Sequence, residues 1–341
     1  MEKALSLLAP LGWIYGFGAS LRRQAYRRGV LRTHRLRSPV ISVGALAMGG
    51  SMKTPSVIEI ARALASRGPD VGILGHGYRG DTSGPLVVSD GEKPLETADK
   101  VGDEAVLLAH ELPGCPVVIG KDKVAAGRLM EERFGRRILL VDSGFQHLRL
   151  HRDLDIVCAT ERDLGSRVLP AGRLREFPRS LNYADLVFTD QVTDGPRVAK
   201  LREKRPKDVF SLARASFGFY PADGTGSDVE PPACAFAFCG LGWPERFIQD
   251  LKAQPGVTVA AHRFFRDHHP YSEQDISDLA SAAQTANATA LVTTAKDAVR
   301  IQNWPGPLPL LVLAAQLQID GLPQVLKRID SVILARIRAG L

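Results

Sequence analysis

A glycine-rich segment between a short strand and a helix is the feature that most constrains this chain. Residues 42–55 read SVGALAMGGSMKTP, and they lead from a β-branched run at 40–43 into an amphipathic helix expected over 54–67. Small residues in such a loop let backbone N–H groups face phosphate oxygens at a helix N-terminus. Lys53 would then contact the β- and γ-phosphates, and the Thr54 hydroxyl would bind Mg²⁺. The segment predicts a nucleotide-binding loop made of Gly49, Gly50, Ser51, Met52, Lys53 and Thr54.

The loop departs from the strict G-x-x-x-x-G-K-[ST] pattern at two positions. Ala47 and Met52 stand where that pattern requires glycine. On these residues alone, a glycine-rich turn without a ligand remains the alternative interpretation.

Short apolar strands and helical patterns alternate along the chain after this loop. Such alternation is typical of a mainly parallel sheet with helices on both faces. The sequence therefore predicts an α/β fold like that of P-loop NTPases. The expected strands are 71–74, 116–119, 138–142, 154–158 and 186–189, and the expected helices are 101–112 and 124–134.

The stretch 224–232, GTGSDVEPP, has the composition of a linker. Beyond it the strand and helix pattern begins again, which predicts a smaller C-terminal α/β lobe. We expect a P-loop domain at 39–223, a linker at 224–232 and the C-terminal lobe at 233–341. The lobe's expected strands are 234–239, 258–261, 290–293 and 309–314, and its expected helices are 244–253, 273–286 and 322–337.

The positive charge of the chain is concentrated at its N-terminus. Residues 1–38 contain eight bases and one acid, so this segment carries +7, which is the net charge of the whole chain. An uncharged stretch at 4–21 precedes the arginines. This order predicts an amphipathic segment that lies at a membrane interface, with apolar side chains in lipid and arginines on anionic headgroups.

Other interpretations of this segment fit less well. A signal peptide would place its charge before the apolar run, and Pro10, Gly12, Gly16 and Gly18 interrupt a spanning helix. A helix packed on the protein's own core remains open. Nucleic-acid binding is not expected, because aromatic residues are not interleaved with the arginines.

The four cysteines, Cys115, Cys158, Cys234 and Cys239, are scattered and lack metal-ligand spacing. We expect free thiols in a reducing compartment.

Further motifs occur along the chain. They are SVGALAMGGSMKTP at 42–55, GY at 77–78, VGDE at 101–104, DSGFQH at 142–147, LPAGRLRE at 169–176, FCGLGWPERF at 238–247, FRDHHPY at 265–271 and TAKDAV at 294–299. Together and in this order they resemble the tetraacyldisaccharide 4'-kinase family of lipid A assembly. The resemblance covers nearly the whole chain.

The resemblance implies a lipid-sugar kinase that depends on ATP and Mg²⁺. Such an enzyme transfers the γ-phosphoryl group to the 4'-hydroxyl of a tetraacyl glucosamine disaccharide 1-phosphate. It implies a peripheral position at the cytoplasmic face of the inner membrane. The oligomeric state is not predicted.

The same resemblance implies roles for individual residues. Asp103 is expected to be the general base toward the sugar hydroxyl, and His268 to orient it as a carboxylate–imidazole pair. Asp142, at the end of the ILLVD strand, is expected to bind Mg²⁺ with Thr54 and Glu104. The residues expected near the substrate, or supporting those that contact it, are Gln146, His147, Arg173, Arg175, Glu176 and Asp267.

Structural interpretations of these residues also exist. An Asp-Glu pair at a helix start is often a helix cap. A zinc site at His268 and His269 is not expected, because no further ligands are evident. We expect Pro270 and Tyr271 to serve in packing.

Several positions depart from the family's usual motifs. They are Ala45, Met52, His76, Ser143 and Ala295, which replace Asn, Gly, Arg, Asp and Glu. Met52 and Ser143 favour slow turnover with an elevated Mg²⁺ requirement. The alternatives are a weakly active or inactive family member that binds nucleotide or lipid, and another P-loop NTPase. A GTPase is one such case, since TAKD at 294–297 imitates a guanine-recognition motif.

Overall fold

The computed structural model describes residues 8–49, 52–68, 70–77, 84–135, 137–191, 195–223, 228–301 and 304–339. Within these ranges, twelve strands form one sheet in the order β10-β9-β11-β12-β8-β7-β6-β1-β5-β2-β4-β3. The strands are β1 Val40–Ala45, β2 Val71–Gly75, β3 Leu86–Ser89, β4 Val117–Ile119, β5 Ile138–Asp142, β6 Leu154–Cys158, β7 Leu186–Asp190, β8 Val209–Pro221, β9 Cys234–Cys239, β10 Thr258–Phe264, β11 Ala290–Thr293 and β12 Leu310–Ile319.

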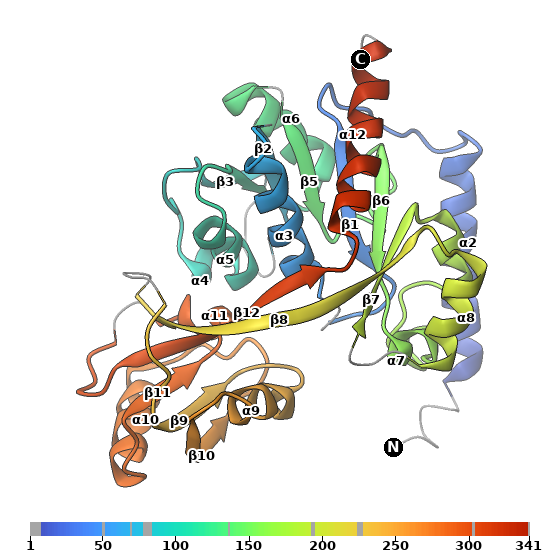
Figure 1. Cartoon of the computed structure of the whole chain (residues 1–341). Coiled ribbons are helices and arrows are strands. Elements are labelled where there is room, and N and C mark those ends of the chain that lie inside the picture. Colours follow the sequence, from blue (N-terminus) through green and yellow to red (C-terminus); the bar gives the residue numbers. More distant parts are fainter. Residues whose placement is uncertain are drawn as a thin grey trace.

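Helices cover this sheet and form the outside of the molecule (Figure 1). They are α2 Ala9–Arg27, α3 Lys53–Ala65, α4 Ala98–Val101, α5 Asp103–Glu111, α6 Lys123–Phe134, α7 Glu161–Leu164, the 3₁₀ helix η1 Pro178–Tyr183, α8 Pro196–Lys204, α9 Pro244–Lys252, α10 Glu273–Thr285, α11 Ala295–Ala298 and α12 Leu322–Arg338.

The first lobe is built on strands β1–β7 and contains the predicted parallel sheet. Its central strands β1, β5 and β2 are buried along their whole length. Strands buried on both faces require a layer of helices on each side. Ile41 packs with α3 and α5 in one core, whereas Val40 packs with α6 in another. The predicted α/β fold with helices on both faces is confirmed.

The second lobe contains β9–β11 and α9–α11, and a pair of long strands connects it to the first lobe (Figure 1). Strand β8 pairs in parallel with β7 on one side and antiparallel with β12 on the other. The sheet is therefore continuous through both lobes. Strand β8 was not predicted, and β12 extends beyond the predicted end at 314 to Ile319.

Helix α12 returns the chain to the first lobe. Val325 and Ile329 are fully buried in the core that also contains α3 and β1. The predicted C-terminal lobe thus contributes its last helix to the core of the predicted P-loop domain. The division of the chain at 224–232 stays a prediction, and residues 224–227 lie outside the described ranges.

Helix α2 packs on the first lobe through its small residues. A Cβ atom at Gly16 would lie 2.5 Å from the Phe177 ring, and one at Gly12 would lie 2.9 Å from the Val168 carbonyl oxygen. Glycine at these positions therefore allows the close approach of the helix. The opposite side of α2 exposes large apolar side chains, namely Leu11, Trp13, Ile14, Tyr15, Phe17 and Leu21.

A buried ion pair fixes the other end of α2. The Arg23 guanidinium donates to both carboxylate oxygens of Glu176, at 2.8 and 2.6 Å, and to the Phe145 carbonyl oxygen at 3.1 Å. The helix thus belongs to the folded body, as in the alternative left open above. No helix in the described part of the chain is long and apolar enough to cross a membrane.

Candidate active site

The predicted nucleotide loop joins β1 to α3, as the sequence indicates. Lys53 is the first residue of α3, and Met52 precedes it in the left-handed conformation, with φ 54°. A side chain in this conformation carries a steric cost that glycine avoids. Gly50 and Ser51 lie outside the described residues, so their predicted role stays a prediction.

The segment 169–176 braces this loop. Leu174 forms a bridge with Ala47, and the Arg173 side chain donates to the carbonyl oxygens of Met48 and Gly49, at 2.8 and 3.1 Å. Arg173 was expected to meet a substrate phosphate. In the structure its guanidinium holds the backbone of the loop.

Three oxygen-bearing side chains form the candidate Mg²⁺ site. The Thr54 hydroxyl donates to Asp142 at 2.8 Å, because β5 ends beside β1 and brings Asp142 to the start of α3. Glu104 is close enough for the Asp142 charge to act on it: burial first, and then that charge, raise the pKa of Glu104. The Lys53 and Lys296 charges oppose this shift.

These donors fit Mg²⁺. Magnesium prefers oxygen ligands, and it is usually held by one or two carboxylates together with substrate phosphates. Among the described residues, no group of three or more His, Cys, Asp or Glu side chains could hold a metal ion. A two-carboxylate site that relies on nucleotide phosphates agrees with that finding.

Ser143 lies beside this site and, like Met52, has a left-handed backbone, with φ 60°. Its hydroxyl donates to Asp142 at 3.2 Å. Two of the departures from the family's motifs thus fall at positions that L-residues rarely occupy. Asparagine and aspartate tolerate this conformation better than serine does.

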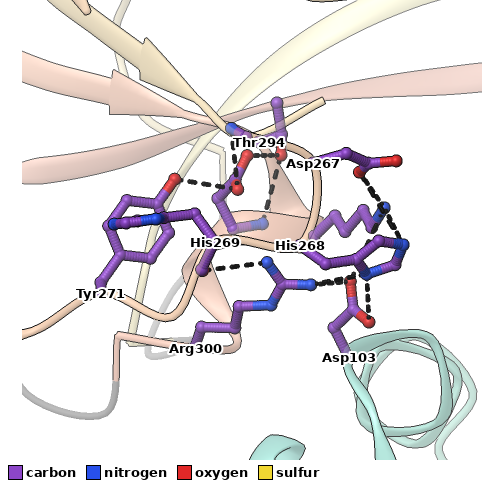
Figure 2. A network of polar contacts seen from close by, with 10 residues as sticks. Asp103, Asp267, His268, His269, Tyr271, Thr294 and Arg300 are labelled. Carbon is purple, nitrogen blue, oxygen red and sulfur yellow. Dashed lines mark hydrogen bonds and ion pairs between the residues drawn. The ribbon is translucent and has the colours of Figure 1, made fainter. Parts of the chain in front are cut away.

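A glycine sets the position of Asp103. The predicted helix 101–112 is interrupted at Gly102, which has φ 88°, and α5 begins at Asp103. No side-chain cap bond forms at this helix start. The buried Asp103 carboxylate instead faces the second lobe, where His268 Nδ1 lies 3.1 Å from Asp103 Oδ1 (Figure 2).

Two cations of the second lobe, Arg300 and Lys296, lie beside this pair, and neither was predicted from the sequence. Arg300 Nη2 lies 2.5 Å from Asp103 Oδ2, and Arg300 Nη1 donates to the His269 carbonyl oxygen at 3.1 Å. Lys296 Nζ lies 2.9 Å from Asp267 Oδ1 and 3.8 Å from Asp103 Oδ2. Lys296 and Arg300 are four residues apart, across α11 and its end. Such a spacing in the sequence is typical of two side chains on the same face of a helix.

Asp297 belongs to the TAKD motif but faces away from this cluster. Its fully buried carboxylate accepts hydrogen bonds from Thr294, Tyr271 and the Gly240 backbone, at 2.6, 2.9 and 3.0 Å. Both oxygens are therefore used inside the second lobe. Tyr271, expected to serve in packing, also takes part in this network (Figure 2).

Gln146 and Glu176 lie behind the loop. Gln146 Nε2 donates to the Ala45 carbonyl oxygen at 3.0 Å and to Glu176 at 3.3 Å. Since Glu176 is also held by Arg23, these two residues link helix α2 to the strand that leads into the loop. A direct contact of either residue with substrate stays a prediction.

His147 lies in a basic environment near the same edge of the sheet. Its ring is 6.1 Å from that of His76, and burial followed by the Lys123 charge lowers the pKa of His147 to about 4. Lys123, which was not predicted, is buried and donates to the Gly75 carbonyl oxygen. Burial lowers the pKa of Lys123 to about 8. Burial first, then the Lys123 charge and then the Arg175 charge, lower the pKa of His76.

A large cavity lies between the lobes. Its volume is about 1150 Å³, and it is lined by residues of α3, α5, α11, β8 and β12. Its wall includes Pro55 in the first turn of α3 and Lys296 of the second lobe.

Comparison with known proteins identifies the family. Residues 4–334 match the family model described as tetraacyldisaccharide-1-P 4'-kinase. The chain belongs to this family. A tetraacyldisaccharide 4'-kinase of Geobacter metallireducens is 40% identical, and the match covers 87% of this chain and 88% of the relative. The one of Chlorobaculum parvum is 34% identical, and the match covers 98% of this chain and 97% of the relative.

The fold agrees with a solved member of the family. The crystal structure of LpxK from Aquifex aeolicus in complex with ATP superposes with a TM-score of 0.79 at 29% identity, and covers 96% of this chain and 99% of that one. The predicted membership in the tetraacyldisaccharide 4'-kinase family is confirmed, as is the predicted fold class.

The left-handed backbone at Met52 leads to a stability prediction. We expect Met52→Gly to raise the free energy of unfolding by roughly 0.5–1 kcal/mol. Glycine removes the steric cost of the left-handed conformation, and the backbone entropy that it adds to the unfolded chain offsets part of this gain. Urea unfolding followed by circular dichroism measures it. Asn287→Gly is the control, since Asn287 also has positive φ, 52°, and asparagine accepts it at lower cost. A loss of stability in Met52→Gly would contradict the prediction.

Proposed function

We propose that this chain transfers the γ-phosphoryl group of ATP to the 4'-hydroxyl of a tetraacyl glucosamine disaccharide 1-phosphate in lipid A biosynthesis. The match of residues 4–334 to the family carries this proposal. The site geometry supports it, because the loop residues Lys53 and Thr54, the carboxylates of Asp142 and Glu104, and the Asp103 cluster are neighbours.

Phosphoryl transfer depends on charge neutralisation and on alignment of the nucleophile. Lys53 supplies a cation for the phosphates at the N-terminus of α3, where the backbone N–H groups also favour anions. Mg²⁺, when bound, would be held by Thr54, Asp142 and Glu104 and would neutralise phosphate charge. Asp103 accepts the proton of the sugar hydroxyl, and His268 orients its carboxylate.

The structure bears differently on the two alternative functions, a GTPase and a weakly active family member. A GTPase would use the aspartate of TAKD for guanine, but the Asp297 carboxylate is buried and bonded inside the second lobe. A weakly active family member is favoured by one observation: Met52 and Ser143 both have left-handed backbones at the nucleotide and metal positions. Slow turnover with an elevated Mg²⁺ requirement follows from that observation.

We also propose that α2 places the enzyme on the cytoplasmic face of the inner membrane. Its glycine side packs on the first lobe, so its large apolar side chains face outward. Ile14 and Phe17 are 69% and 65% exposed, which is costly in water and favourable in lipid. The exposed arginines after residue 21 would then contact anionic headgroups, whereas Arg23 is buried in its ion pair with Glu176 and does not take part.

The kinase assignment predicts that Lys53→Ala loses activity. Without this cation, the moving phosphoryl group loses one of the groups that neutralise its charge, and removal of one such stabilising group typically costs on the order of 10²–10³ in rate. The assay follows radiolabelled phosphate from ATP to the lipid acceptor, with the position of the new phosphate read by NMR. Lys252→Ala, an exposed lysine at the end of α9, is the matched control. Unchanged transfer in Lys53→Ala would refute the loop assignment.

The membrane proposal predicts the behaviour of a double variant. Ile14→Glu with Phe17→Glu should reduce sedimentation with anionic liposomes, because two charges replace apolar groups on the outer side of α2. Wild-type binding should weaken with salt, since headgroup contacts are screened. The control places the same substitutions at Leu334 and Ile337 of α12, which are 52% and 60% exposed. Equal sedimentation of the two double variants would contradict the proposal.

A further inference from the structure

The two ring nitrogens of His268 face different partners (Figure 2). Nδ1 lies 3.1 Å from Asp103 Oδ1, and Nε2 lies 3.3 Å from Lys296 Nζ. An ammonium group has three donors and no acceptor. The contact with Lys296 is therefore a hydrogen bond only if Nε2 carries the lone pair. A neutral ring then has its proton on Nδ1, from which it can be donated to Asp103.

Arg300 also approaches His268 Nδ1, where it affects the choice of tautomer. Arg300 Nη2 lies 2.9 Å from His268 Nδ1 and 2.5 Å from Asp103 Oδ2. A guanidinium only donates, so a bond to Nδ1 would favour the opposite tautomer. The carboxylate is the nearer and the charged acceptor, and charge-assisted hydrogen bonds are about twice as strong as neutral ones. Nη2 carries two N–H groups, so its bond to Asp103 leaves one that faces His268 Nδ1. At Nδ1, Asp103 as acceptor therefore competes with Arg300 as donor, and the partner of Nε2 decides the tautomer.

Asp267 is the other candidate partner of Nε2. Its Oδ1 lies 3.8 Å from Nε2, which is too long for a hydrogen bond. Lys296 Nζ contacts both groups, because it lies 2.9 Å from Asp267 Oδ1 and 3.3 Å from His268 Nε2. Without Lys296, an Nε2 proton would find an acceptor in Asp267.

The backbone of His268 shows that this arrangement is imposed by its surroundings. Its φ is 61°, in the left-handed region, and such conformations persist only where neighbouring contacts fix them. Arg300 supplies one such contact, because Nη1 donates to the carbonyl oxygen of the adjacent His269. The ring is thus held in place by the same cations that contact Asp103.

We propose that Lys296 is a positioning residue that fixes the Nδ1–H tautomer of His268, while Arg300 fixes the carboxylate of Asp103. Together they present an oriented carboxylate–imidazole pair to the sugar hydroxyl. The catalytic consequence rests on the proposed function, in which Asp103 is the base. The proposed tautomer of His268 does not rest on that function.

NMR of the full-length protein with ¹⁵N-labelled histidine tests the proposal. The His268 signals are those lost in His268→Gln, and long-range ¹H–¹⁵N couplings report which nitrogen carries the proton. We expect Nδ1–H in the wild-type protein and a shift toward Nε2–H in Lys296→Met. Lys296→Arg keeps a cationic donor and should restore the wild-type tautomer at least in part, and Lys252→Met, remote from the site, is the control.

Kinetics of the same variants connect the tautomer to turnover. We expect Lys296→Met to lower kcat by about 10- to 100-fold, the usual effect of removing a group that orients an imidazole, with KM for ATP nearly unchanged. A role limited to the ion pair with Asp267 would leave the tautomer and kcat as in the wild-type protein. Lys296→Arg should recover kcat together with the tautomer.

Three results would overturn the proposal: an Nε2–H tautomer or an imidazolium in the wild-type protein, an unchanged tautomer in Lys296→Met, or a changed tautomer with unchanged kcat. The first needs only the wild-type protein and His268→Gln for assignment, so a folding defect in Lys296→Met does not remove the test. Failure of the proposed role of Asp103 as the base is recognised separately, by full phosphate transfer in Asp103→Ala.

Discussion

The buried carboxylate of Asp103 makes electrostatic contacts between the two lobes. Asp103 belongs to the first lobe, and the groups that contact its oxygens, His268 and Arg300, belong to the second. A carboxylate buried without partners is costly, so these contacts stabilise the arrangement in which the lobes meet. Strands β8 and β12 make the contact possible, because they extend one sheet through both lobes. The second lobe therefore supplies the groups that contact the proposed base at the start of α5.

Local pattern was sufficient to predict much of this architecture. The strand, loop and helix around Lys53 follow from residue spacing, and so do the buried parallel strands and the place of Asp142 at the end of one of them. The contact between Asp103 and His268 was predicted from the family resemblance. No local pattern joins two residues that are 165 positions apart.

Other features depend on tertiary context that the sequence does not display. Strand β8 has few uninterrupted apolar positions, and its partners β7 and β12 are remote in the chain. The break at Gly102 is a backbone property that a helical pattern conceals. The glycines of α2 were interpreted as weaknesses of a helix, whereas they are its packing surface. Arg300 and Lys123 resemble ordinary surface cations until the fold buries them beside carboxylates or carbonyl oxygens.

We expect residues of the two lobes to act as one catalytic unit, and a double-mutant cycle on kcat measures whether they do. Groups that act together share a single loss, so their effects are not additive. Asp103→Ala and His268→Ala should each slow phosphate transfer strongly, and the double variant should be little slower than the worse single one. His262→Ala, on the exposed side of β10, should combine additively with Asp103→Ala. If the losses from Asp103→Ala and His268→Ala instead multiply in full, the two residues act independently and the account is contradicted.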